Sequence, residues 1–144
     1  MHANRDEIEP FVRGVLGCGC PDEVFQRMEL ATGQADPGGL VFTRLVIGGR
    51  LLIHVVAWLD ADEARLPVET LARLGLADRD RAGCHRFRLV LASAKEGPVP
   101  AAIPDAFRAV VGRDDRAHLH WLPASSVPSV LLPGLSGPPE AAGT

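Results

Sequence analysis

The feature that most constrains the fold is a pair of apolar segments, 40–47 and 50–59, joined by Gly48 and Gly49. Both segments are rich in Val, Ile and Leu, which favour β-strands. Glycine accepts the positive φ angles of a two-residue hairpin turn, so the pattern predicts an antiparallel hairpin. The second segment is apolar at odd and even positions alike, and only His54 interrupts it. We therefore expect a central strand that is covered on both faces, with His54 as a core histidine.

The remaining elements follow from periodicity and from helix-ending glycines. We expect helices over 7–17, 67–75 and 104–111 and further strands over 26–31, 85–92 and 117–122. Pro10 interrupts the first helical pattern, and Gly75 is expected to end the second helix. The Gly- and Pro-containing segment 32–39 predicts a loop, and the charged segment 76–83 predicts a short helix or a loop.

The element order is therefore α-β-β-β-α-β-α-β. It predicts a single α/β (α+β) domain with a mixed five-stranded sheet and helices packed on it, without internal repeats. The β-α-β-α-β portion requires parallel strands with right-handed crossovers, and the first two strands extend the sheet as an antiparallel meander. We place this domain at residues 1–122. Residues 123–144 form a proline-rich segment whose apolar stretch, Val127–Leu135, either packs on the domain or binds a second copy or a partner protein.

This order of a helix, three strands, a helix and a strand resembles the core of restriction-endonuclease-like nucleases. That family places an acid on one hairpin strand and an acid-x-Lys motif on the next. The corresponding strands here carry Arg44 and His54, with Asp60 only at the end, and no acid-x-Lys is present. The resemblance thus covers topology alone and implies an inactive, interaction-type relative rather than a metal-dependent nuclease.

Charge and composition narrow the class of partner. The chain has 15 basic and 18 acidic residues, and its arginines are dispersed, so we expect no nucleic-acid binding, which draws most of its affinity from a basic surface. No apolar run approaches the ~20 residues needed to cross a bilayer, and no signal peptide is recognisable. We expect a cytoplasmic protein. The use of Ala, Arg, Gly and Pro with one lysine, Lys95, is typical of a GC-rich bacterial genome.

The most distinctive local motif is Cys18-Gly19-Cys20, followed by Pro21 and two acids. Cys20 is expected at the N-terminus of a helical turn, where backbone N–H groups stabilise a thiolate and lower its pKa. Cys20 would then be the reactive thiolate, with Cys18 as the resolving or co-ligating thiol. The alternative is that both cysteines are small buried residues that close the first helix against the sheet.

A metal site would draw on Cys18, Cys20, Cys84 and His85. Three thiolates and an imidazole match a structural zinc site by residue type. The spacing is unusual, because one residue separates the first pair and none separates the second. Copper(I) or an iron–sulfur cluster are the alternatives, although a cluster would need a fourth cysteine, for example from a dimer.

A third candidate site lies where the parallel strands end. Ligands of open α/β sheets bind beyond the carboxyl ends of the strands. Asp60, Asp62, Lys95 and Ser125 follow three of the predicted strands and could form a polar pocket there. His118 and His120, two apart on the last strand, share one face. Phosphate-loop, dinucleotide-binding, nucleophile-elbow and His-Glu-x-x-His motifs are absent from the sequence.

The sequence therefore leaves three functions open. The first is a small accessory protein with thiol-redox or metal chemistry at the Cys18-Gly19-Cys20 loop, self-associating as a homodimer. The second is a catalytically silent interaction domain that uses the apolar C-terminal segment. The third is a small-molecule enzyme with its site at the strand ends.

Overall fold

The computed structural model describes residues 5–15, 17, 26–35, 40–58, 68–93 and 98–132. Its centre is a five-stranded sheet in the order β1-β2-β3-β4-β5, which confirms the predicted fold. The strands are β1 (Met28–Ala35), β2 (Leu40–Ile47), β3 (Leu51–Trp58), β4 (Arg86–Ser93) and β5 (Ala117–Pro123). The helices are α1 (Arg5–Pro10), α2 (Val68–Ala82) and α3 (Ala102–Val111), and short turns are η2 (Phe11–Val15), η5 (Ala124–Ser126) and η6 (Ser129–Leu131).

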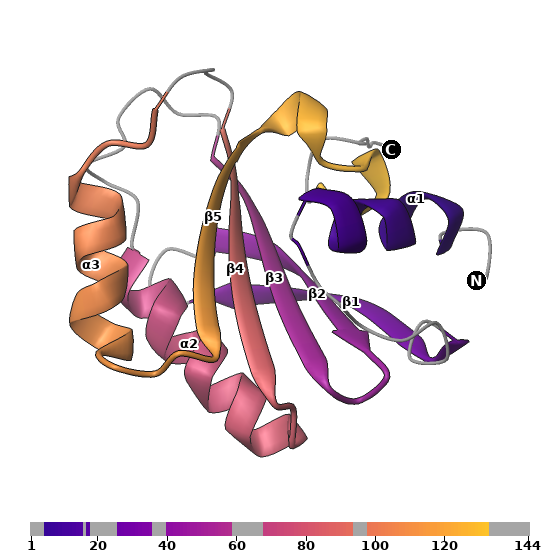
Figure 1. Cartoon of the computed structure of the whole chain (residues 1–144), viewed down its shortest axis with the longest axis horizontal. Coiled ribbons are helices and arrows are strands. Elements are labelled where there is room, and N and C mark those ends of the chain that lie inside the picture. Colours follow the sequence, from indigo (N-terminus) through magenta and orange to yellow (C-terminus); the bar gives the residue numbers. More distant parts are fainter. Residues whose placement is uncertain are drawn as a thin grey trace.

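The sheet is mixed in the way the sequence predicts. Strands β1, β2 and β3 are antiparallel neighbours, whereas β3, β4 and β5 are parallel. Helices α2 and α3 lie on one side of the sheet, and α1 lies on the other side with the turns that follow β5 (Figure 1). No helix in the described ranges is long and apolar enough to span a membrane.

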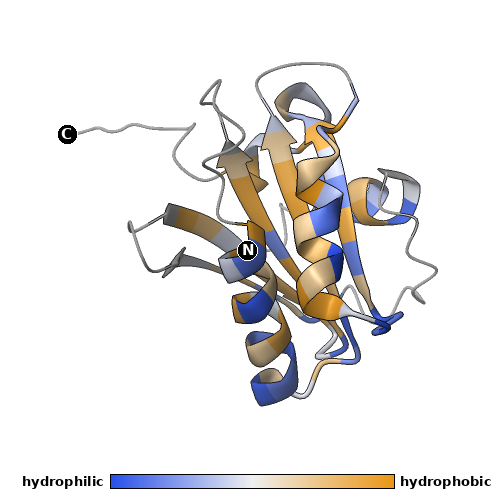
Figure 2. Cartoon of the chain, turned by 90° about the vertical axis from the view of Figure 1, so that its left-hand side faces the viewer, coloured by the Kyte–Doolittle hydropathy of each residue, from blue (hydrophilic) through white to orange (hydrophobic). Residues whose placement is uncertain are grey.

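Two apolar layers hold this arrangement together, one on each side of the sheet. The α1-side layer contains Ile8, Phe11, Val12, Leu45, Ile47, Leu51, Ile53, Val55, Val90, Ala92, Val127, Leu131 and Leu132. The α2-side layer contains Phe42, Val46, Leu52, Val56, Val68, Leu71, Ala72, Cys84, Phe87, Leu89, Leu91, Ile103, Phe107 and Ala117. In Figure 2 the central strands are coloured mainly as hydrophobic, while the helices carry residues of both kinds. β3 contributes to both layers, as expected for a strand covered on both faces.

The first strand is longer than predicted and begins later. The prediction of a strand over 26–31 and a loop over 32–39 is wrong at both ends, because β1 runs from Met28 to Ala35. Thr32 pairs with Thr43, and Ala35 pairs with Leu40. The polar residues of this segment are therefore in a strand because β2 offers a complete hydrogen-bonding ladder, and this pairing overrides their weak intrinsic preference.

Gly75 does not end the second helix. Helix α2 continues through it to Ala82, so the charged segment 76–83 is mostly helical. A Cβ atom at position 75 would overlap the Phe87 ring, so glycine here allows the helix to approach β4 closely. The helix ends instead at Ala82, and the next residue, Gly83, has a positive φ of 74°. Cys84 N donates a hydrogen bond of 2.9 Å to Arg79 O at this helix end.

The first helix changes its winding at Pro10. The α-helix ends at this residue and continues as one π-helical stretch over Phe11–Val15. Proline has no N–H to donate, so the regular α-helical ladder is interrupted at this position. Ile8, Phe11 and Val12 nevertheless remain buried against the sheet, as predicted.

The segment after β5 packs on its own domain over the described part. Val127, Leu131 and Leu132 are buried in the α1-side layer, and Val130 packs against it. These side chains, which the sequence made candidates for partner binding through Val127–Leu135, are therefore covered by this chain. Residues 133–144 lie outside the described residues.

Candidate functional site

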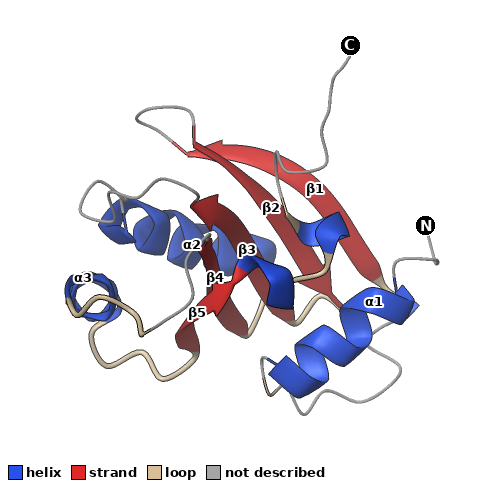
Figure 3. Ribbon diagram, turned by 90° about the horizontal axis from the view of Figure 1, so that it is seen from above, coloured by secondary structure: helices blue, strands red, loops and turns tan. Residues whose placement is uncertain are grey.

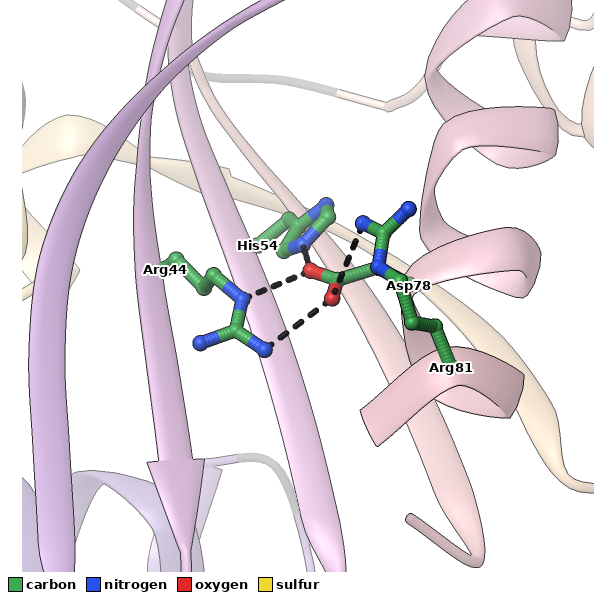
Figure 4. Close-up of polar contacts among 4 residues, drawn as sticks. All are labelled: Arg44, His54, Asp78 and Arg81. Carbon is green, nitrogen blue, oxygen red and sulfur yellow. Dashed lines mark hydrogen bonds and ion pairs between the residues drawn. The ribbon is translucent and has the colours of Figure 1, made fainter. Parts of the chain in front are cut away.

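The most complete polar cluster in the described residues joins α2 to the hairpin strands (Figure 4). Arg44 on β2 donates two hydrogen bonds to Asp78 on α2, from Nε to Oδ2 at 2.7 Å and from Nη2 to Oδ1 at 3.0 Å. His54 Nε2 lies 2.8 Å from the same Oδ2, and Arg81 Nη2 lies 3.7 Å from Oδ1. Arg44 and His54 are direct partners in the β2–β3 ladder, so both project towards α2.

The charges in this cluster are set by burial and pairing. Burial lowers the pKa of His54, although Asp78 acts to raise it, so the imidazole is neutral at pH 7. Burial alone would raise the pKa of Asp78, but the hydrogen bonds from Arg44 and His54 lower it below its usual value. Asp78 is thus an ionised acceptor, and His54 donates its Nε2 proton to it.

Two aromatic rings, those of Phe42 and Phe87, pack against the His54 imidazole. The Phe42 ring centroid lies 4.4 Å from that of His54, and the Phe87 ring meets it edge-on at 5.2 Å. His54 Nδ1 is buried and has no hydrogen-bond partner in the part of the chain that the structure describes. The His54 side chain is buried, and the contacts of Asp78 join α2 to β2 and β3, so we call the Arg44–His54–Asp78 cluster a clamp between helix and sheet.

The structure separates the predicted metal ligands that it describes. Cys84 is buried in the α2-side layer, whereas its neighbour His85 is exposed. Burial raises the pKa of the Cys84 thiol, which disfavours the thiolate that a metal or redox site needs. The element leading into the cysteine loop packs in the opposite, α1-side layer. Cys18 and Cys20 themselves lie outside the described residues, within which no three His, Cys, Asp or Glu side chains form a metal-binding group.

The predicted site at the strand ends is described only in part. Ser125 is exposed in the turn after β5. Asp60, Asp62 and Lys95 lie outside the described residues, so the structure does not bring this set together.

A second polar region lies on the α1-side face of β4 and β5. We call Arg86, Arg88, His118 and His120 the basic row. Arg88 is the direct ladder partner of His118, and its Nη1 donates to His120 Nε2 at 2.8 Å. Burial, then the Arg88 and Arg86 charges, lower the pKa of His118, with Asp115 acting in the opposite direction. Burial, Arg88 and His118 lower the pKa of His120 to about 4.

The opposite face of β5 borders a groove against α3. The groove holds about 370 Å³ and is lined mainly by apolar side chains. Its residues are Val99, Pro104, Phe107, Arg108, Val111, Gly112, Asp114, Ala117, His118, Leu119 and Trp121. The carboxylate of Asp114, which lines the groove, forms an ion pair with Arg79, whose Nη2 lies 2.8 Å from Oδ2. Its negative charge is therefore balanced within this chain. Leu119 and Trp121 remain half-buried at the groove floor.

The outer edge of β5 carries backbone groups that point away from the sheet. Phe87 N donates to Arg116 O at 2.9 Å, so the backbone of Arg116, and with it that of His118 and His120, faces β4. The alternate residues, Leu119 and Trp121, therefore direct their N–H and C=O groups outwards. β5 is the last strand of the sheet, and no described residue pairs with this edge. From above, β5 lies next to α3, with α1 on the other side of the sheet (Figure 3).

Comparisons with protein-family models, with curated proteins and with solved structures find no match to this chain. The topological resemblance to nucleases gains no catalytic support from the described strands. β2 and β3, which would carry the acids of that family, contain no Asp or Glu over Leu40–Ile47 and Leu51–Trp58.

Sequence reasoning identified His54 as a core residue but missed its partner. Asp78 lies in the charged segment 76–83, whose pattern of residues did not single it out. The requirement that a buried imidazole has a hydrogen-bond partner could have pointed to an acid facing His54. The groove was missed because it depends on how α3 sits beside β5. The alternation of Leu119 and Trp121 with two histidines was the signal for a two-sided edge strand.

Proposed function

We propose that this chain is a protein-binding domain that holds an extended segment of a partner against the edge of β5, with side chains in the groove beside α3. This is a form of the silent interaction domain that the sequence suggested, with the binding surface at β5 instead of the C-terminal segment. The observation that supports it is the combination of a strand edge with which no described residue pairs and an apolar groove along the same strand.

The physical basis is strand addition. An extended segment forms main-chain hydrogen bonds to an exposed strand edge, and pockets for alternate side chains supply specificity. Leu119 and Trp121 offer both parts, since their backbones face outwards and their side chains line the groove. Edge strands with unpaired backbone groups are liabilities that proteins usually cover or block. An edge with which none of the described strands pairs, beside an apolar groove, therefore favours a binding role.

The test is a selection of random displayed peptides on the immobilised protein and two variants. Leu119→Glu puts a charge into the groove. Leu30→Glu is the matched control, because Leu30 is 40% exposed on β1, at the opposite edge of the sheet. Circular dichroism establishes that each variant is folded.

We expect peptide families that bind the wild type and Leu30→Glu equally and bind Leu119→Glu at least tenfold more weakly. The proposal is overturned if no family is enriched over an unrelated protein. It is equally overturned if folded Leu119→Glu binds the enriched peptides as well as the wild type does.

We also propose thiol or metal chemistry at the Cys18-Gly19-Cys20 loop as a second function. Its support is the sequence motif, two cysteines separated by one glycine and followed by Pro21; the motif lies outside the described residues. The test is elemental analysis for zinc, copper and iron after anaerobic purification, with the Cys18→Ser/Cys20→Ser double variant as control. Stoichiometric metal that the double variant loses would support metal binding. Without metal, thiol reactivity against pH decides, and a reactive thiol with an ordinary pKa would refute the redox role.

A further inference from the structure

We propose that the contact of α2 with the sheet is an acid-sensitive control of the β5 groove. Protonation of His54 favours an open state, in which the C-terminal half of α2 has left the sheet and no longer holds the α3 end of the groove. This inference rests on the proposed function, because it names a form of regulation for the same binding surface. It is carried by the surroundings of His54 and by the contacts that α2 makes on either side of residue 78.

The His54 site has a place for a neutral imidazole but none for a second proton. The residue is 1% exposed, and its Nε2 lies 2.8 Å from Asp78 Oδ2. Nδ1 is buried without a hydrogen-bond partner among the described residues, while the rings of Phe42 and Phe87 pack against the imidazole. A protonated imidazole donates from both nitrogens. The Nδ1 proton would therefore be buried without an acceptor, which costs free energy.

The charged groups around His54 do not remove this cost. Asp78 is the carboxylate in contact with the imidazole, and Arg44 already donates to both of its oxygens. The titratable groups of the surrounding elements are Glu29 on β1, Arg44 on β2, Asp78 and Arg81 on α2, and Cys84 after α2. β4 faces this layer with apolar side chains. Burial lowers the pKa of His54, and the Arg44 charge adds to this against the opposing effect of Asp78.

α2 is the element whose movement would admit water to the imidazole. β3 is hydrogen-bonded to β2 and to β4, whereas α2 is held on the sheet by side-chain contacts. Local opening of such an element costs less than global unfolding. Below the ordinary pKa of about 6.5, a proton binds better to the hydrated imidazole than to the buried one. Acid therefore shifts the population towards the open state.

The same turn of α2 supports the groove. Arg79 follows Asp78 in the helix, and its Nη2 lies 2.8 Å from Oδ2 of Asp114, which lines the groove. Asp114 N in turn donates to the carbonyl of Val111, the last residue of α3 and a second groove residue. α2 and α3 lie next to each other on one side of the sheet (Figure 1). When the C-terminal half of α2 leaves the sheet, the groove loses the ion pair that fixes its α3 end.

The experiment is amide hydrogen exchange by NMR on the full-length protein between pH 7 and pH 5. Rates are expressed as protection factors, which remove the intrinsic effect of pH on exchange. The reporters are the amides of residues 78–82 on α2 and those of Gly112 and Asp114, which are hydrogen-bonded at the end of α3. We expect both sets to be less protected than β3 and to lose protection together, about tenfold for each pH unit below about 6.5.

Two variants assign the effect to its histidine. His54→Gln retains an N–H that can donate to Asp78 but does not titrate, so it should make the protection of both sets independent of pH. His120→Gln is the matched control, because it removes an imidazole of β5 that contacts Arg88 and not Asp78. It should keep the pH dependence of the wild type at both sets of amides.

The wild type by itself can overturn the inference, even if His54→Gln does not fold. A His54 ring that NMR shows to be charged at pH 6, in a protein whose α2 protection is unchanged, would mean that the clamp accepts the proton. Protection of α2 that stays constant from pH 7 to pH 5 would be equally contrary. Loss of protection in α2 that leaves Gly112 and Asp114 protected would show that α2 does not control the groove.

A peptide from the random selection tests the link to partner binding. If the peptide binds the state with α2 on the sheet, a concentration of about 100 Kd should raise the protection of residues 78–82 at pH 5.5 about a hundredfold. A peptide that protects Leu119 and Trp121 but leaves α2 unchanged would overturn this inference and leave the proposed function intact. A selection without enriched peptides would overturn the proposed function and, with it, the regulation of that function.

Discussion

Two histidines on neighbouring parts of the same sheet have opposite surroundings. His54 contacts Asp78 Oδ2, which also accepts a hydrogen bond from Arg44, and two phenylalanine rings pack against the imidazole. His120 accepts a hydrogen bond from Arg88 and lies beside His118 on an edge strand. The pKa of both imidazoles is lowered, with burial as the largest cause. The charged group next to each differs, because a carboxylate lies beside His54 and an arginine lies beside His120.

The comparison separates a region that is closed by its own contacts from the region where we propose that a partner binds. The Arg44–His54–Asp78 cluster satisfies its charges internally and fixes α2 on the sheet. The basic row lies on β4 and β5, beside a strand edge with which no described residue pairs. Stability experiments should therefore respond most strongly at Asp78, and binding experiments at β5.

The largest expected effect is that of Asp78→Asn. The substitution leaves the Arg44 guanidinium without a counter-charge and replaces one of the two acceptor oxygens by an N–H donor, which we expect to cost about 3 kcal/mol of unfolding free energy. Urea unfolding followed by circular dichroism measures the change. Asp105→Asn breaks an exposed pair with Arg108 and should change stability by no more than about 0.5 kcal/mol. Equal effects of the two substitutions would show that the clamp is no stronger than a surface pair.

Gly75→Ala tests how much of the stability of the α2–sheet contact comes from close packing and not from the charged clamp. A methyl group at this position would overlap the Phe87 ring and push α2 away from β4, so we expect a loss of about 2 kcal/mol in unfolding free energy. Phe87 is also in contact with His54, so the displacement should weaken the clamp as well. Adding Phe87→Leu should recover part of the loss. A stabilised Gly75→Ala protein, as helix propensity alone predicts, would contradict this packing.

The pH dependence of stability tests the surroundings of His120, the second histidine of the comparison. The folded pKa of His120 is about 4, below the value of about 6.5 in the unfolded chain. Between these values the unfolded state binds more protons, so stability falls as the pH is lowered from 7 towards 4. Because His120 is partly exposed, we expect its share of the loss to be about 1–2 kcal/mol. His54 and His118 shift in the same direction and add to it.

Urea unfolding at pH 7, 6, 5 and 4.5 measures this dependence, with His120→Gln beside the wild type. The variant should have a shallower decline, since glutamine can still accept from Arg88 but does not titrate. A slope that His120→Gln does not alter would assign the pH dependence to the other groups.

The sequence was sufficient for the fold wherever a single pattern determined it. The Gly48-Gly49 hairpin, the two-faced apolar strand and the β-α-β-α-β order led directly to the observed sheet. Errors occurred where tertiary contacts decide, as in β1, whose polar half is held by pairing with β2. The prediction that Gly75 ends the second helix was wrong for a related reason. Its lack of a side chain leaves space for the Phe87 ring, a contact that only the folded structure shows.

The candidate sites were less predictable than the fold. Residue type suggested a set of Cys18, Cys20, Cys84 and His85, but type does not reveal which side of a sheet each residue occupies. Cys84 is buried under α2, and His85, one residue later, is exposed. The alternation of histidines with Leu119 and Trp121 was compatible with an edge strand, but a binding surface there escaped prediction, because it requires knowing how α3 sits beside β5.

The central claim is that a partner segment pairs with the outer edge of β5. The most direct measurement is amide hydrogen exchange by NMR, with and without the most enriched peptide of the selection. In the free protein, the amides of Leu119 and Trp121 should exchange rapidly, while those of His118 and His120 should be protected by β4. The account predicts that the peptide protects Leu119 and Trp121 and leaves the other two unchanged. Peptide binding that leaves the Leu119 and Trp121 amides exchanging as in the free protein would contradict it.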